Sequence, residues 1–143
     1  MTEQEPSTNS SMTDKSALRA LYEYYIDFCN AHDFQAMEKF YTAPAIRIND
    51  EPWTPSRVTD QFRPLVEGFP DWHWEIRHFV IDDNFLSLHF RVTGTHLGVF
   101  QGIPPTGKKV ETTQFTLYRV VGGVKFDAVW DMTDFDSVIK QIS

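Results

Sequence analysis

The chain has 143 residues, with 20 acidic and 13 basic side chains, and its formal net charge is −7 at pH 7. This balance disfavours nucleic acid and anionic membranes as partners, because both favour a basic patch. Aromatic residues make up 15% of the chain, which suits either a pocket for a flat hydrophobic ligand or an aromatic core. The length predicts one domain with room for one small-molecule pocket.

The single cysteine, Cys29, cannot form an internal disulfide, and its helical apolar surroundings indicate a small buried hydrophobe. The sequence shows no basic-then-apolar signal segment and no run of about 18 apolar residues. A soluble, cytoplasmic protein is therefore expected. Residues 1–12 are polar and contain Pro and Ser, so they are predicted to be a disordered leader before a domain at residues 13–143.

Apolar residues recur at helical spacing from Lys15, with Thr13 or Asp14 as the expected cap. Thr54-Pro55 has the sequence of a helix start, and Pro64 is expected to kink or shorten that helix. The predicted helices are residues 15–31, 33–41 (with Asp33 as cap), 55–68 and a last one ending near Gln141.

Alternating apolar residues dominate the second half of the chain and predict strands. Two short turns, Asp82–Asn84 and Gly122-Gly123, fit antiparallel hairpins. The predicted strands are residues 45–49, 72–81, 85–96, 110–121 and 124–132. Helices followed by a meander define an α+β domain whose sheet curls around a helix-lidded cavity.

One histidine continues the buried side of a predicted strand. Leu86, Leu88, Phe90 and Val92 alternate with polar residues, and the same period directs His96 inward. A pocket imidazole and a core histidine satisfied by hydrogen bonds both fit this pattern.

The last strand offers a candidate acid/base group. Strand period places Asp131 on one face with Asp127 and Val129, and Trp130 on the other. An inward Asp131 beside aromatic rings would have a raised pKa, because desolvation disfavours its charged form, and this suits proton transfer near neutrality. The alternative is a solvated carboxylate or a helix cap.

Other polar side chains give weaker signals. Gln114 and Thr116 share one strand face with Tyr118, and His78 is predicted to share an inner face with Trp74. A structural histidine is the alternative for His78. No histidine pair has metal-ligand spacing with a carboxylate, and no Gly-rich loop opens a helix, so neither a metal nor a dinucleotide cofactor is predicted.

Several segments together resemble the SnoaL-like polyketide cyclase family, within the nuclear-transport-factor-like, ketosteroid-isomerase-like superfamily, over about Leu18 to Ile142. The segments are Tyr25–Tyr41, Phe69–Trp72, GTHLGVFQGIPPTGK from Gly94, Tyr118-Arg119 before Gly122-Gly123, and Trp130-Asp131 followed by Asp134.

The resemblance implies a cone-shaped, curved mixed sheet around a pocket, a homodimer, and a hydrophobic polyketide-like ligand bound without a cofactor. It places Asp131 where the cyclases have an acid/base Asp, and it places Thr116 where they have a His on the preceding strand. Asn49 matches a pocket Asn whose amide would donate to an enolate oxygen, and a turn residue is the alternative.

The predicted function is a cofactor-independent cyclase or isomerase of secondary metabolism, in which Asp131 moves a proton next to a carbonyl and His96 or Asn49 stabilises the oxyanion. A dehydratase, which would favour His78 and His96, an epoxide hydrolase and a non-catalytic carrier are the alternatives. The predicted substrate-binding residues are Tyr25, Asn49, Trp53, Trp74, His78, Phe100, Gln114, Thr116 and Trp130.

Overall fold

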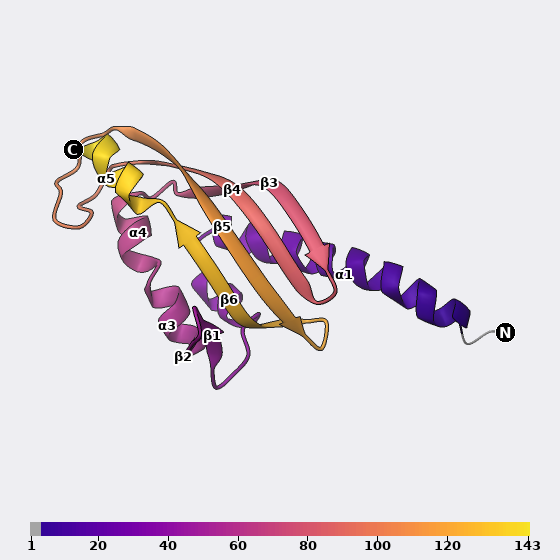
Figure 1. The fold of residues 1–143 in the computed structure, drawn as a ribbon. Coiled ribbons are helices and arrows are strands. Elements are labelled where there is room, and N and C mark those ends of the chain that lie inside the picture. The colour runs from indigo at the N-terminus through magenta and orange to yellow at the C-terminus, as the bar shows by residue number, and fades with distance from the viewer. Residues whose placement is uncertain (1–3) are drawn as a thin grey trace.

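The computed structural model describes residues 4–143, with side chains from Asp14 onward. In this part of the chain, helices precede a run of long strands (Figure 1). The helices are α1 (Gln4–Asn30), α2 (Phe34–Glu38), α3 (Pro55–Asp60), α4 (Arg63–Gly68) and α5 (Phe135–Ile142), and the strands are β1 (Ile46–Ile48), β2 (Glu51–Trp53), β3 (His73–Asp82), β4 (Phe85–Thr95), β5 (Lys109–Val121) and β6 (Lys125–Thr133).

The strands form one mixed sheet in the order β2-β1-β6-β5-β4-β3. The β1–β6 pair is parallel and the other pairs are antiparallel. Figure 1 shows the long strands curving together, with α1 crossing behind them and α3 and α4 beside β6. The predicted α+β class with a curved mixed sheet is confirmed, and the sheet remains unclosed between β2 and β3.

Turn chemistry explains the meander. Asp83 has φ +54° in the β3–β4 turn, and Gly122 and Gly123 have φ +61° and +70° between β5 and β6. Two consecutive positive φ values match the twist of a tight hairpin, and glycine adopts them without steric penalty. Both predicted hairpins are therefore present.

The helix predictions hold in type and differ at the boundaries. Thr13 and Asp14 lie inside α1 and do not cap it, since the helix starts at Gln4; Pro6 sits in the first turn, where a missing N–H is tolerated. The predicted leader, 1–12, remains a prediction, and residues 1–3 lie outside the described residues. Asp33 caps α2 as predicted, because its carboxylate accepts the Ala36 N–H at 3.2 Å.

The predicted third helix is divided into α3 and α4. The Thr54 hydroxyl accepts the Arg57 N–H at 3.2 Å and starts α3 before Pro55. Pro64 lies in the first turn of α4, the position that proline tolerates, so it shortens the helix as expected. This break turns α4 toward the loop between β4 and β5, whose Leu97 and Gly98 N–H groups donate to the Gly68 carbonyl at 3.0 Å.

Buried tyrosines fill the interior between α1 and the sheet. The Tyr22 hydroxyl donates to that of Tyr118 at 3.0 Å, and the Tyr25 and Tyr41 hydroxyls share a hydrogen bond of 2.6 Å. Burial raises the pKa of all four tyrosines, and it raises the pKa of the Cys29 thiol to about 12. Cys29 is thus a small buried hydrophobe, as predicted.

One β-bulge overturns a predicted strand face. Ile76 pairs with Phe90 and His78 pairs with His89, so Arg77 is an extra residue in β3. Alternation reverses beyond an extra residue. His78 therefore lies on the opposite face from Trp74, and the prediction that they share the inner face is wrong.

Candidate active site

An aromatic cavity of about 360 Å³ opens between the inner face of the sheet, the α3–α4 segment and the loop between β4 and β5. This volume lies within the range of small-molecule sites. Its aromatic walls are Phe62, Trp72, Trp74, Phe100 and Phe135, and its polar groups are Gln61, Glu67, Gln101, Gln114, Asp131 and Thr133.

Asn49 is hydrogen-bonded to Asp131, the one carboxylate that β6 contributes to this cavity. The parallel pairing of Ile48 with Val129 brings the end of β1 beside Asp131. Asn49 turns there with φ +48°, which asparagine tolerates better than most residues. Its Oδ1 accepts the Asp131 N–H at 3.1 Å, and its Nδ2 donates to Asp131 Oδ1 at 3.3 Å.

Asp131 lies at the mouth of the cavity, partly exposed to solvent and partly enclosed by protein. Desolvation raises the pKa of its carboxyl, and the hydrogen bond from Asn49 lowers it, with a net rise. In the described part of the chain, Asp131 Oδ2 has no hydrogen-bond partner. This arrangement suits a group that exchanges a proton with a ligand.

A chain of side-chain hydrogen bonds runs across the inner face of the sheet toward Asp131. The Trp74 indole Nε1–H donates to Gln114 Oε1 at 2.8 Å, and Gln114 Nε2 donates to the Thr116 hydroxyl at 2.9 Å. Because indole nitrogen only donates, the orientation of the Gln114 amide is determined. Thr116 is buried and pairs with Asp131 in the β5–β6 register.

His96 is fully buried, as the strand pattern predicted, but the described residues that line the cavity do not include it. Its Nδ1 lies 2.9 Å from the Thr106 hydroxyl and accepts the Thr106 backbone N–H at 3.2 Å. The ring packs beside Phe69, with 5.4 Å between centroids. The structure thus does not bring His96 together with Asp131.

Other predicted residues lie away from the cavity. Trp130 is on the outer face of the sheet and donates to Asp50 at 2.9 Å, because Asp131 takes the inward position on β6. Tyr25 belongs to the core, and Trp53 packs under the Arg57 guanidinium at 3.9 Å.

The structure brings Trp74, Phe100, Gln114 and Asp131 together around the cavity, with Asn49 joined through Asp131. Four residues that complete the walls were not predicted from the sequence: Phe62, Leu65, Trp72 and Phe135. Trp72 stands in the segment used for the family resemblance, and Phe62 and Leu65 are three residues apart, which places them on one side of a helical segment.

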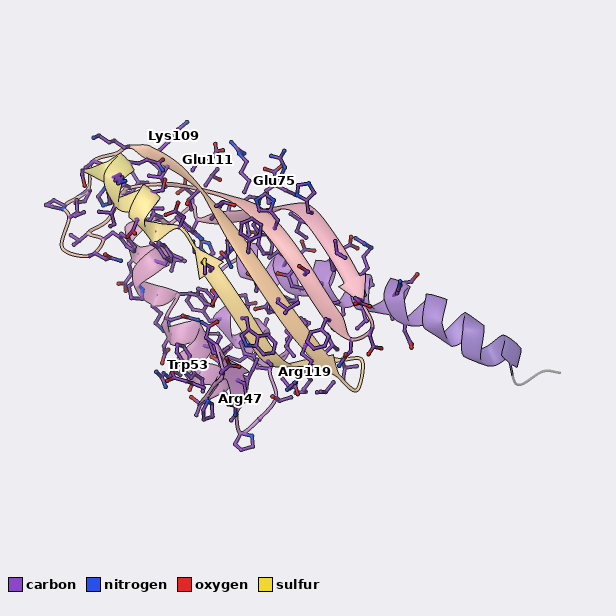
Figure 2. All side chains as sticks on the ribbon, viewed as in Figure 1. Arg47, Trp53, Glu75, Lys109, Glu111 and Arg119 are labelled. Carbon is purple, nitrogen blue, oxygen red and sulfur yellow. The ribbon has the colours of Figure 1, made fainter. Side chains whose placement is uncertain are left out.

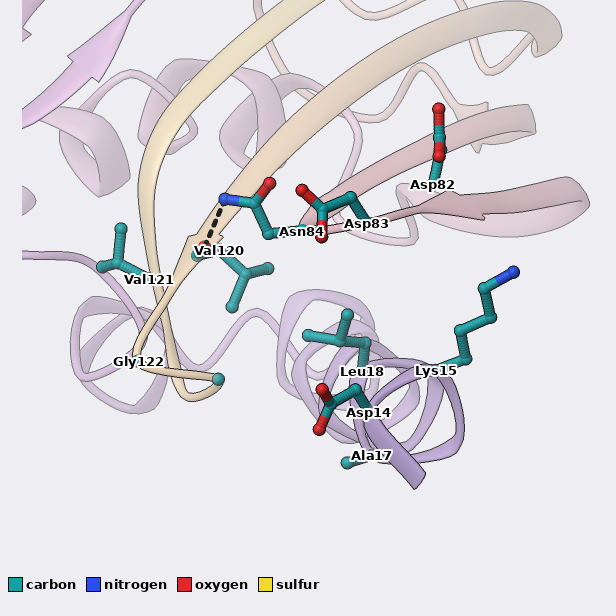
Figure 3. Close-up of a pocket in the computed structure, with 11 residues that line it drawn as sticks. Asp14, Lys15, Ala17, Leu18, Asp82, Asp83, Asn84, Val120, Val121 and Gly122 are labelled. Atoms are coloured by element: carbon teal, nitrogen blue, oxygen red, sulfur yellow. Dashed lines mark hydrogen bonds between the residues drawn. The ribbon is translucent and has the colours of Figure 1, made fainter. Parts of the chain in front are cut away.

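A larger hollow of about 860 Å³ lies between the middle of α1 and the turns after β3 and β5 (Figure 3). Asn84 donates to the Val120 carbonyl at 3.1 Å on one wall. The described lining combines three aspartates, Asp14, Asp82 and Asp83, with Lys15, Asn84 and aliphatic and glycine residues, and it contains no aromatic ring. We therefore take the Asp131 cavity as the candidate site.

Within the described residues, no three His, Cys, Asp or Glu side chains lie close enough to hold a metal ion. None of the described helices is both long and apolar enough to cross a membrane.

The fold and the site define a small α+β protein with an open, curved sheet and an aromatic cavity that has an aspartate at its mouth. The chain belongs to the SnoaL-like polyketide cyclase family, whose profile matches residues 19–142. The resemblance seen in the sequence is confirmed. No curated protein sequence matches the chain significantly.

Solved structures share this fold at low sequence identity. AclR from Streptomyces galilaeus, provisionally described as a hydroxylase, has a TM-score of 0.79 and 23% identity, covering 89% of this chain and 96% of its own. A SnoaL-like polyketide cyclase from Agrobacterium tumefaciens has a TM-score of 0.73 and 22% identity, covering 88% and 98%. IdmH from Streptomyces antibioticus, provisionally described as a polyketide cyclase, has a TM-score of 0.73 and 21% identity, covering 90% and 97%. These likenesses show the fold.

Proposed function

We propose that this protein is a polyketide cyclase-type enzyme in which Asp131 moves a proton next to a carbonyl group of a hydrophobic, polyketide-like substrate. The observation that carries the proposal is a partly desolvated carboxyl with a raised pKa at the mouth of an aromatic cavity. Membership of the family supports the reaction class.

In the proposed reaction, the Asp131 carboxylate takes a proton from a carbon next to a carbonyl, leaving an enolate. The enolate carbon attacks a second carbonyl of the same molecule, which forms the ring bond and an alkoxide. Protonated Asp131 then returns the proton to that alkoxide, so atoms and charge balance. The raised pKa favours both transfers, since a base near the working pH is also a competent acid.

Asn49 has two roles in this proposal. Its Nδ2 carries two hydrogens, one of which is directed to Asp131. The second is available to an enolate oxygen, whose charge a positioned donor stabilises. Isomerisation needs the same two residues and omits the ring bond.

The cavity walls support a flat, hydrophobic substrate. Trp72, Trp74 and Phe100 are at least nine-tenths buried and line the cavity beside Gln114. Gln114 Nε2 donates one hydrogen to Thr116, which leaves its second hydrogen for a substrate carbonyl. Aromatic walls with few polar groups are typical of sites for planar ligands.

We also propose a homodimer formed through the outer face of the sheet. Phe115 and Met132 pair across β5 and β6 on this face and are 56% and 75% exposed. Arg91 bridges Glu75 and Glu111 at 3.3 and 2.8 Å on the same face, where Figure 2 shows the two glutamates near one end of the long strands. An apolar area bordered by charge suits a self-complementary interface.

The residue paired with Asp131 favours a second candidate, a non-catalytic carrier. Thr116 occupies that position, and its hydroxyl accepts from Gln114. A hydroxyl cannot take up a proton as imidazole does. The site would then lack a second group for proton transfer, and the protein would bind its ligand in the cavity without converting it.

The deciding experiment combines crystal soaking with one substitution. Crystals are soaked with a dihydroxyanthraquinone and with a linear poly-β-ketone, and the enzyme proposal expects a ligand oxygen or carbon within about 3 Å of Asp131. Asp131→Asn is then expected to abolish conversion of the poly-β-ketone and to retain binding. Asp127→Asn on the same strand is the matched control. An extra residue in β6 overturns the predicted shared face of Asp127 and Asp131, and Asp127 pairs with Arg119 on the outer face. Binding without conversion by the native protein supports the carrier.

A further inference from the structure

We infer that His96 is a positioning residue, which shapes the ligand cavity by holding the loop 97–107 and does not itself touch the ligand. The inference rests on the proposed function only in taking the Asp131 cavity as the ligand site. It deepens that function by naming the element that sets one cavity wall.

The loop between β4 and β5 supplies that wall. Val99, Phe100 and Gln101 line the cavity together with residues of α4. Phe100 and Ile103 exchange backbone hydrogen bonds of 3.1 and 2.9 Å around Gln101 and Gly102, whose φ values are +47° and +79°. This tight turn fixes the tip of the loop but does not attach it to the domain.

His96 attaches the returning end of the loop with its main chain and its ring. Its N–H donates to the Lys108 carbonyl at 2.9 Å, and its carbonyl accepts from Gly107 at 2.8 Å. Its Nδ1 accepts the Thr106 N–H at 3.2 Å and lies 2.9 Å from the Thr106 hydroxyl, which accepts from Lys108 at 3.3 Å. Three successive residues at the end of the loop, Thr106 to Lys108, are thus held by one histidine.

The protonation of the ring follows from these contacts. A backbone N–H is always a donor, so Nδ1 must be the acceptor and the neutral ring carries its hydrogen on Nε2. In the described part of the chain, this Nε2 is buried without a partner. An unpaired buried donor is unfavourable, and an apolar side chain of similar size would avoid it. The contacts of Nδ1 account for a histidine at this position.

The ring also connects the loop to the cavity wall through Phe69. Phe69 packs between His96 and Phe100, with centroid distances of 5.4 and 5.1 Å. Gly68 receives the Leu97 and Gly98 N–H groups on its carbonyl. The base of the loop, the end of α4 and the ring of His96 therefore form one packed unit.

The test uses the whole protein and three variants. His96→Leu removes the acceptor together with the unpaired donor, His96→Asn retains an acceptor near Nδ1, and Thr106→Val removes the hydroxyl from an exposed loop position. His73→Asn, at an exposed histidine of β3, is the matched control. Loop opening is measured by tryptic cleavage at Lys108 and by amide exchange at Gly107, whose N–H donates to the His96 carbonyl. The integrity of the cavity is measured by the affinity for a dihydroxyanthraquinone.

His96→Leu is expected to speed cleavage and exchange about tenfold. It should also lower the affinity for the anthraquinone by a similar factor, as expected for a lost buried hydrogen bond. Its urea midpoint should not fall, because the unpaired donor is also gone. His96→Asn should bring loop opening and anthraquinone affinity to within about twofold of the native protein. Thr106→Val should open the loop and lower the affinity less than His96→Leu does. Nitrogen NMR of native His96 should show a hydrogen on Nε2.

Two results would overturn the inference: a hydrogen on Nδ1, or a His96→Leu variant with native loop exchange and native affinity. If His96→Leu does not fold, Thr106→Val decides, and native values of both readouts reject the inference. If the native protein does not bind the anthraquinone, the cavity proposal fails, while cleavage and exchange still test whether His96 holds the loop.

Discussion

Asn49 contacts Asp131 through both atoms of its side-chain amide, although the two residues are 82 positions apart in the chain. Its Oδ1 accepts from the Asp131 main chain, and its Nδ2 donates to the carboxylate. One contact fixes where the aspartate lies, and the other favours its charged form. Asn49 is thus expected to control both the position and the pKa of Asp131.

Replacing Asn49 by Gly tests that control. Glycine accepts the positive φ of this turn, so the substitution removes the amide and retains the backbone. The pKa of Asp131 is expected to rise further, because the group that lowers it is lost. A carboxyl carbon NMR titration measures this pKa, and the acidic limb of any pH–rate profile should move to higher pH with it. An unchanged pKa would show that the Asn49 contact is absent in solution.

Asp131→Asn should not destabilise the protein near neutral pH. Desolvation raises the pKa of Asp131 in the folded chain, so the folded state binds this proton more tightly than the unfolded state. The contribution of Asp131 to stability is therefore highest below its unfolded pKa of about 3.9 and falls as the pH rises through the folded value. Urea unfolding at pH 7 should give the variant a free energy of unfolding equal to or above that of the native protein. A clear loss of stability at pH 7 that diminishes in acid would contradict this sign.

Gly98→Ala should displace the loop that forms the cavity wall. A Cβ at this position would lie 2.0 Å from the Glu67 carbonyl oxygen, which belongs to the backbone of α4 and cannot rotate away. We expect a loss of about 2 kcal/mol in the free energy of unfolding and weaker anthraquinone binding. Gly102→Ala is the control, because nothing lies within 4 Å and only its φ of +79° opposes the change. Native binding by Gly98→Ala would show that the loop accommodates a methyl group.

Phe115→Lys should separate the proposed dimer. A lysine at this exposed position places a charge in the apolar centre of the proposed interface, where it would be desolvated. Light scattering should give a dimer mass for the native protein and a monomer mass for the variant, with unchanged circular dichroism. Val124→Lys, at an exposed turn position, is expected to remain dimeric. A native protein that is monomeric at all concentrations would exclude the interface.

Local patterns in the sequence predicted much of the fold correctly. The alternation of β4 predicted that His96 is buried, Asp33 caps a helix, and Pro64 shortens one. Such features depend on residues a few positions apart, since strand period, capping and proline geometry are local effects.

The same local patterns could not predict which residues meet at the site. One extra residue in β3, Arg77, puts His78 on the outer face. No residue type in this segment of the sequence indicates a bulge. The inward position of Asp131 placed Trp130 outside. Strand period defines two faces and does not say which of them is buried.

The sequence by itself determined the α+β class, the order of most elements, the family and the choice of Asp131 as the candidate acid/base. Only the tertiary structure decided that Asn49 contacts Asp131, that α3 and α4 complete the cavity, and that His96 contacts the loop. The physical reason is that cavity walls and hydrogen-bond partners come from segments that lie far apart in the chain. The parallel β1–β6 pairing and the break between α3 and α4 bring those segments together.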